Sequence, residues 1–122
     1  MQTVNTQFVT SVLMNTNITS SPIAVNQLYG FSIQAVYTST SSGTLKLQAS
    51  ADPFNNNAMH PDSITTPTHW TDIADSSATI SGTGTYIWNI NGAFYNYVRL
   101  VFTDSSSGSN TGRLTATLNG KY

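Results

Sequence analysis

Hydrophobic and polar residues alternate along several short stretches of this chain, with the two-residue period of a β-strand. The clearest stretch covers residues 29–38, where aromatic and aliphatic side chains occupy every second position and Ser32 and Gln34 lie between them. Residues 44–50 alternate in the same way. Because a loop of five residues, 39–43, separates the two stretches, the pattern predicts an antiparallel hairpin.

An aromatic-rich part of the chain is expected to form the centre of the core. It consists of two apolar runs, residues 85–90 and 95–102, on either side of an Asn-Gly dipeptide. Both faces of the second run are largely apolar, which is typical of a central strand covered on both sides. The Asn-Gly dipeptide favours a tight hairpin within one sheet. The alternative, which we favour, is a crossover between two sheets at residues 91–94, with Trp88 and Leu100 meeting between them.

Further short strands are expected at regular intervals, over residues 7–13, 23–28, 69–74, 76–80 and 113–119. No apolar repeat of 3.6 residues lasts long enough to predict a helix. About eight short strands at this spacing predict an all-β, single-domain antiparallel β-sandwich of the jelly-roll type.

The remaining segments are interpreted as an arm and two loops. Residues 1–28 have a weaker pattern than residues 29–122, so we expect the first strands and an N-terminal arm that reaches a neighbouring subunit, followed by the sandwich core. Residues 51–68 contain three prolines and three consecutive asparagines, which predicts a long surface excursion. Residues 105–112 are expected to form a second, flexible loop.

Charged side chains are scarce. Only 7% of the 122 residues are charged, none is glutamate, and the net charge is −1, whereas about 25% is typical of soluble domains. Such a surface does not suit nucleic acid, and it is poorly defended against association. We therefore expect a homo-oligomer, for example a trimer. The chain lacks an apolar run of about 18 residues and a signal-peptide pattern, so neither a membrane span nor a leader is expected.

The sequence carries little catalytic chemistry. It lacks the Gly-x-Ser-x-Gly motif of many hydrolases, and its aspartates fall in expected loops or at strand ends rather than in a buried acid pair. A small hydrolase is an alternative that would depend on His60 or His69. His60 and Asp62 also have ligand types that suit a divalent metal, but a His-Pro-Asp run in such a loop is more often a turn. We therefore expect no enzyme, cofactor or metal.

Arg99 lies within an apolar run, where an unpaired charge would be costly. The interpretation we favour places it on a sheet face, stacked on Tyr95 or Tyr97 and paired with Asp72 or Asp104. The other interpretation makes it the polar centre of a ligand or subunit contact. Exposed aromatic rings would form a sugar-stacking platform, although a domain of this size needs most of them in its core. The candidate contact residues are Trp70, Tyr95, Tyr97, Arg99, His60 and Asp62.

Residues 29–36 and 43–50 form an ordered series that continues through residues 70–73, 97–102 and 118–121. This series resembles small structural proteins of tailed bacteriophages, and the resemblance spans nearly the whole chain. The Trp-Thr-Asp-Ile and Tyr-Val-Arg-Leu pieces are also similar to those of discoidin-type, galactose-binding-like jelly rolls, in which they are mainly framework residues. This chain lacks the terminal cysteine pair that often closes that fold.

The resemblance implies a non-enzymatic virion component, either a capsid decoration (cement) protein or a head-fibre or tail accessory subunit. Its partners would be capsid or tail proteins of the same particle and its own copies, and it would be made in the host cytoplasm without a signal peptide. The alternative is a carbohydrate-binding module that attaches the particle to a host glycan. Residues 51–68 and 105–112 would then border the sugar site.

Overall fold

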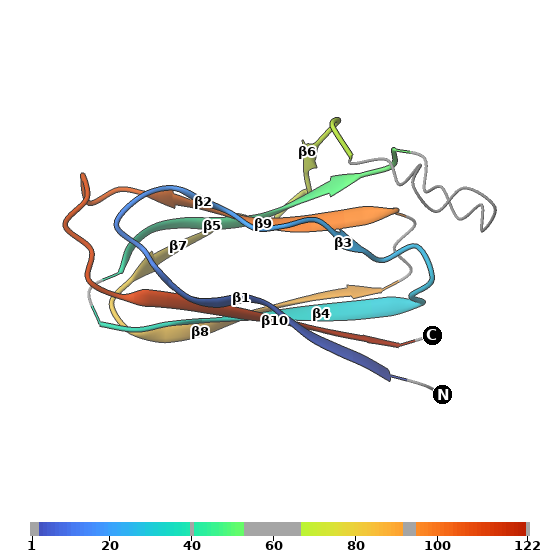
Figure 1. Ribbon diagram of the computed structural model, residues 1–122, viewed down its shortest axis with the longest axis horizontal. Helices are drawn as coiled ribbons and strands as arrows, with labels where there is room; N and C mark the ends of the chain where they lie inside the picture. Colours follow the sequence, from blue (N-terminus) through green and yellow to red (C-terminus); the bar gives the residue numbers. More distant parts are fainter. Residues whose placement is uncertain (1–2, 40, 53–66, 92–94, 122) are drawn as a thin grey trace.

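The protein is an all-β sandwich in which two antiparallel sheets pack face to face (Figure 1). The computed structural model describes residues 3–39, 41–52, 67–91 and 95–121. These residues form ten strands, which are β1 (Thr3–Leu13), β2 (Ile18–Thr19), β3 (Ile23–Ala24), β4 (Gly30–Tyr37), β5 (Ser42–Ser50), β6 (Thr71–Asp72), β7 (Ala78–Ser81), β8 (Gly84–Asn91), β9 (Tyr97–Asp104) and β10 (Arg113–Lys121).

The strand order is that of a jelly roll. One sheet, called sheet A, has the order β1-β10-β4-β8, and the other, sheet B, has β9 and β5 at its centre. The short strands β2 and β3 both pair with β9, and β6 and β7 both pair with β5. The ten strands therefore occupy eight positions, four in each sheet, as two interlocked Greek keys require. The predicted fold class is confirmed.

The core lies between the sheets and comes from the inward face of each strand. Val98, Leu100 and Phe102 of β9 are at most 1% exposed, and they face a similar row from β4 and β10 in sheet A. Trp88 of β8 joins the same cluster. Because β8 belongs to sheet A and β9 to sheet B, the chain crosses between the sheets after Asn91, and the crossover prediction is confirmed.

The predicted hairpin between residues 29–38 and 44–50 is wrong. The two stretches do form β4 and β5, but these strands lie in different sheets. Alternation identifies the inward face of each strand and says nothing about which strand lies beside it. The start of β5 lies very close to β9, where a side chain at Gly43 would collide with the Phe102 ring and the Thr103 carbonyl. Gly43 thus lets the start of β5 pack tightly on β9.

The N-terminal residues belong to both sheets in this single chain. β1 pairs with β10 along most of its length, from Thr3 opposite Lys121 to Leu13 opposite Arg113. β2 and β3 then extend sheet B beside β9. The idea that residues 1–28 reach a neighbouring subunit stays a prediction.

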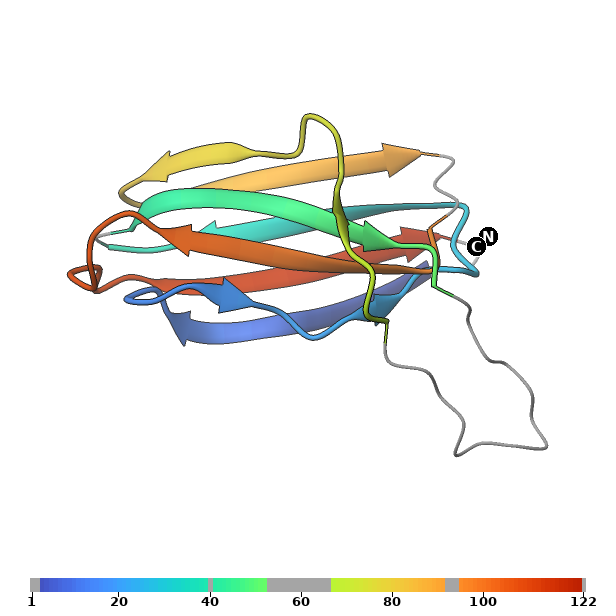
Figure 2. The same ribbon diagram turned by 90° about the horizontal axis from the view of Figure 1, so that it is seen from above.

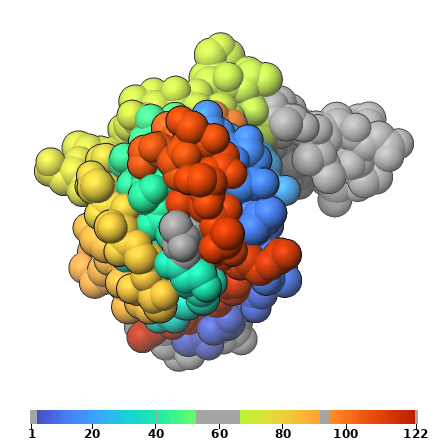
Figure 3. All heavy atoms as spheres, turned by 90° about the vertical axis from the view of Figure 1, so that its left-hand side faces the viewer, coloured from blue at the N-terminus to red at the C-terminus, as the bar shows by residue number. Residues whose placement is uncertain are grey.

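The loop of residues 105–112, expected to be flexible, is held by a dense set of hydrogen bonds. Asn110 is 3% exposed; its Oδ1 accepts from the Ser42 amide, and its Nδ2 donates to the Met14 carbonyl, each at 3.0 Å. Asp104 accepts from the backbone amides of Ser106 and Gly108. Figure 3 views this end of the sandwich, where the orange-red loop lies beside the teal start of β5.

Candidate functional site

A strap of residues 67–74 crosses the outer face of sheet B (Figure 2). Arg99 lies under the Trp70 ring of this strap. Arg99 is on the outward face of β9, and its guanidinium carbon lies 4.2 Å from the centre of the Trp70 ring. A cation over an aromatic face is stabilised by the ring quadrupole. Arg99 was expected to stack on Tyr95 or Tyr97; the ring that lies over it is that of Trp70.

Arg99 starts a line of polar side chains that crosses three strands of sheet B. Its Nε donates to the Gln48 side-chain oxygen at 2.8 Å, and the Gln48 amide donates to Asp72 at 2.8 Å. The Lys46 ammonium forms an ion pair with the other Asp72 oxygen at 3.1 Å. The predicted partnership of Arg99 with Asp72 is therefore indirect, because Gln48 stands opposite both residues in the ladder.

These contacts shift two pKa values. The Gln48 amide and then the Lys46 ammonium hold the pKa of Asp72 below its usual range. Partial burial beneath the strap lowers the pKa of Arg99. With the Trp70 ring and Gln48 as its neighbours, the guanidinium connects the strap to the sheet.

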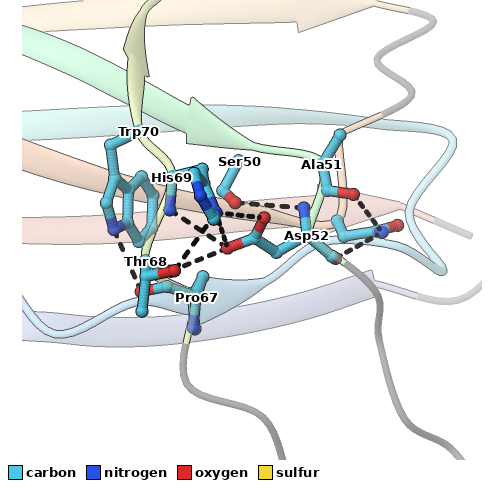
Figure 4. Close-up of polar contacts among 8 residues, drawn as sticks. Ser50, Ala51, Asp52, Pro67, Thr68, His69 and Trp70 are labelled. Carbon is cyan, nitrogen blue, oxygen red and sulfur yellow. Dashed lines mark hydrogen bonds and ion pairs between the residues drawn. The ribbon is translucent and has the colours of Figure 1, made fainter.

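Asp52 links the two described segments that flank residues 53–66 (Figure 4). Most of the excursion predicted over residues 51–68 lies outside the described residues. The Asp52 Oδ2 accepts from the backbone amides of Thr68 at 2.7 Å and His69 at 3.0 Å. These two hydrogen bonds, Thr68 first, lower the pKa of Asp52. On the other side, Asn96 donates to the Asp52 carbonyl at 2.8 Å. Asp52 therefore joins both ends of residues 53–66 to the start of β9.

Thr68, His69 and Asp52 resemble a catalytic triad in composition but not in geometry. A triad needs the hydroxyl on one ring nitrogen and the carboxylate on the other. Here both Thr68 Oγ1 and Asp52 Oδ1 lie 3.1 Å from the same atom, His69 Nδ1. The His69 side chain is also 85% exposed. This cluster holds the backbone of Thr68 and His69 against Asp52, and its geometry provides no activated hydroxyl.

The other candidate contact residues are divided between the core and the undescribed part of the chain. Tyr97 is 6% exposed, and Tyr95 is partly buried against the core. Neither offers a free ring face of the kind that sugar stacking needs. His60 and Asp62 lie outside the described residues. Within the described ranges, no three His, Cys, Asp or Glu side chains gather as they would around a metal ion, and no helix could span a membrane.

Sequence reasoning missed a second surface, a trough on the outer face of sheet A. The trough has a volume of about 400 Å³. Gly30 of β4 lies on its floor between Lys121 and Asn91, and Ser32 lies between Asn119 and Asn89 in the next row. Tyr29 forms one wall. The lining residues used below are Tyr29, Gly30, Asn89, Asn91, Asn119 and Lys121.

The trough presents groups that are free to bind. Tyr29 is 78% exposed, the largest value among the exposed hydrophobic side chains of the described residues. The amides of Asn89, Asn91 and Asn119 form no side-chain hydrogen bond with another described residue. Their positions on β8 and β10 follow from the same alternation that fixed the inward faces. What the sequence lacked was the register that brings the three amides together.

Comparison with known proteins shows similarity in fold alone. No protein-family model and no curated protein matches the sequence. Among solved structures, the SPBc2 prophage-derived protein YomS has a TM-score of 0.58 at 13% identity, over 98% of this chain and 95% of YomS. PirA has a TM-score of 0.52 at 16% identity, over 97% and 92%. A coat protein of Tobacco streak virus covers 98% and 86% at 9% identity, with a TM-score of 0.48 that is too low to support an argument.

Proposed function

We propose that this chain is a non-enzymatic structural subunit of a bacteriophage particle, acting as a capsid decoration protein or as a head-fibre or tail accessory subunit. The observation that carries the proposal is the jelly roll shared over nearly its full length with YomS, a prophage-derived protein. The sequence resemblance to phage structural proteins supports the same role. Its partners would be capsid or tail proteins, and its location the virion.

The chemistry of the site favours a mechanical role. Arg99, Asp72 and Asp52 fasten the strap and the excursion to sheet B, so these charged groups are engaged within the fold. The outer face of sheet A is formed mainly by hydroxyl and amide side chains, and Arg113 and Lys121 at the ends of β10 are its cations. A surface of this kind binds other proteins by shape and hydrogen bonding rather than by charge.

Quantitative mass spectrometry of purified particles tests the proposal. A decoration protein should be present in a fixed ratio to the major capsid protein, whereas a fibre or tail subunit should be present in only a few copies. Particles assembled without a decoration protein should release their DNA at a lower temperature than complete particles. Absence of the chain from particles that package DNA normally would rule out all of these roles.

A second candidate function, binding of a saccharide on the host surface, is favoured by the trough on sheet A. Sugars bind to aromatic rings through their apolar faces and to planar amides through their hydroxyls, and Tyr29 with the three asparagines supplies both. The Trp70 platform considered from the sequence is disfavoured, because Arg99 covers one face of that ring.

A glycan array probed with three proteins separates these possibilities. We expect the wild type and Trp70→Phe to bind the same sugars and Tyr29→Ala to lose at least tenfold in affinity. Loss of binding in Trp70→Phe but not in Tyr29→Ala would return the site to the strap. No binding by the wild type to any glycan would leave the particle role as the remaining proposal.

A further inference from the structure

The four lateral edges of the sandwich differ in how they are protected. An exposed edge strand offers unpaired backbone groups to any passing strand, so proteins break such edges with bulges, charges, prolines or short strands. Both edges of sheet B are broken, one into β2 and β3 and the other into β6 and β7. The β1 edge of sheet A has two register shifts, and its Ser11 has a φ of 48°.

The β8 edge has none of these protections. All eight residues, Gly84 to Asn91, pair with β4 in one unbroken register. The strand contains no charged residue and no proline. Within residues 3–39, 41–52, 67–91 and 95–121, no strand pairs with the edge of β8 that faces away from β4. At its centre, Ile87 is 57% exposed on the outer face.

The inward face of β8 is also incomplete. Tyr86 and Ile90 point toward the core, yet they are only partly buried, and in the described part of the chain no strand lies beyond β8. The Tyr86 ring lies 4.8 Å from that of the buried Trp88. A strand added beside β8 would extend this aromatic cluster and remove more apolar surface from water.

We propose that two copies of this chain associate through β8, antiparallel, to form a continuous eight-stranded sheet. With Ile87 of one copy opposite Ile87 of the other, the alternation places Tyr86 opposite Trp88 on the core side and Thr85 opposite Asn89 on the outer side. No like charges meet in this register, since the strand has none. A second copy is therefore an occupant that fits the edge along its full length.

The pairing is expected to be reversible. An eight-residue strand is about 27 Å long, and joining two edges buries less than the roughly 1,600 Å² of a standard interface. We therefore expect a monomer–dimer equilibrium at micromolar concentrations rather than a permanent dimer. This inference does not depend on the virion role, because association is measured on the isolated chain.

The absence of cysteine from the chain allows a site-specific cross-linking test. In Ile87→Cys the two introduced thiols face each other across the twofold axis, where opposite Cβ atoms are about 5 Å apart, close enough for a disulfide after small adjustment. Gln34→Cys is the matched control, because Gln34 stands beside Ile87 on the same face but one strand inward. Its two copies would lie roughly 14 Å apart, given strand spacings of about 4.8 Å.

Mild oxidation should convert most of Ile87→Cys to a covalent dimer and leave Gln34→Cys at the background level. In sedimentation of cysteine-free protein, Ile87→Lys should raise the dimer dissociation constant at least tenfold. Its melting temperature should equal that of the wild type when both are measured at concentrations low enough for the monomer. Val12→Lys, at an exposed position on the opposite edge, should leave the dimer dissociation constant unchanged. Equal cross-linking of both cysteine variants, or a wild type that is monomeric at about 500 μM, would overturn the proposal.

Discussion

Replacement of Asn110 by alanine should destabilise the sandwich more than its position in a loop suggests. The Asn110 side chain joins three segments that are distant in sequence, at Met14, Ser42 and Asp104. Alanine would leave the Ser42 amide and the Met14 carbonyl without these hydrogen bonds. The Ser42 carbonyl would keep its bond from the Ser105 amide at 3.3 Å.

The expected cost follows from the two groups left unpaired. A buried backbone group without a partner costs about 1–3 kcal/mol, so Asn110→Ala should lower the free energy of unfolding by about 2–6 kcal/mol. For a chain of 122 residues, 1 kcal/mol corresponds to about 4 °C in melting temperature. The melting temperature should therefore fall by roughly 8–24 °C. This is a large part of the 5–15 kcal/mol typical of a domain.

Urea and thermal unfolding followed by circular dichroism would measure the change. Thr111→Ala is the control, because the neighbouring Thr111 is exposed and its side chain forms no hydrogen bond with the described residues. Asn110→Asp adds a second test, since it places a carboxylate about where Nδ2 lies 3.1 Å from Asp104. Repulsion raises the folded-state pKa of the pair, so its stability deficit relative to wild type should shrink as the pH falls toward about 3.

Two results would contradict this account of Asn110. One is a loss in Asn110→Ala no greater than that in Thr111→Ala. The other is an Asn110→Asp deficit that is the same at pH 7 and at pH 3. Either would mean that water or a local rearrangement satisfies Ser42 and Met14 at little cost.

Three further predictions concern charge and packing. Hydrogen bonds depress the pKa of Asp52 and Asp104. Their contribution to stability is therefore present above the unfolded pKa of about 3.9 and is lost as the pH falls through the folded pKa values. Urea unfolding at a series of acidic pH values should show this loss, and the free energy of unfolding should change less steeply with pH in Asp104→Asn. Arg99→Ala should cost about 1–3 kcal/mol through the lost Trp70 and Gln48 contacts, measured by urea unfolding. Gly43→Ala should cost about 3 kcal/mol or more or prevent folding. At Gly82 a side chain meets no atom within 4 Å and only the φ of 80° opposes it, so the melting temperature of Gly82→Ala should change less.

The fold class could be predicted because each strand carries its own signal. Alternation identified Phe31, Ile33 and Leu47 as inward-facing, and all three are buried. The order of strands in each sheet has no such local signal, since the partner of β4 is set by contacts with β8 and β10 that are far away in sequence. The incorrect hairpin shows this: two regular strands and a short polar loop are equally typical of a hairpin and of a corner between sheets.

The candidate site could be predicted only where a residue conflicts with its surroundings. Arg99 in an apolar run required an explanation, and the structure supplies one beneath Trp70. Gln48 is unremarkable in the sequence, and it became important only when the register placed it between Arg99 and Asp72. Likewise, exposure of Tyr29 depends on where β4 begins, one residue later than the alternation suggested.

The scarcity of charge and the way the loops are held have a common explanation. Three of the five acidic residues, Asp52, Asp72 and Asp104, accept hydrogen bonds that fasten the excursion, the strap and the end loop. Long irregular segments lack ladder hydrogen bonds, and a carboxylate can satisfy several backbone amides at once. These three carboxylates therefore hold segments of the chain to the sheets, and strands such as β8 carry no charge. A sandwich built in this way has an uncharged edge at β8, which is what the proposed association of two copies requires.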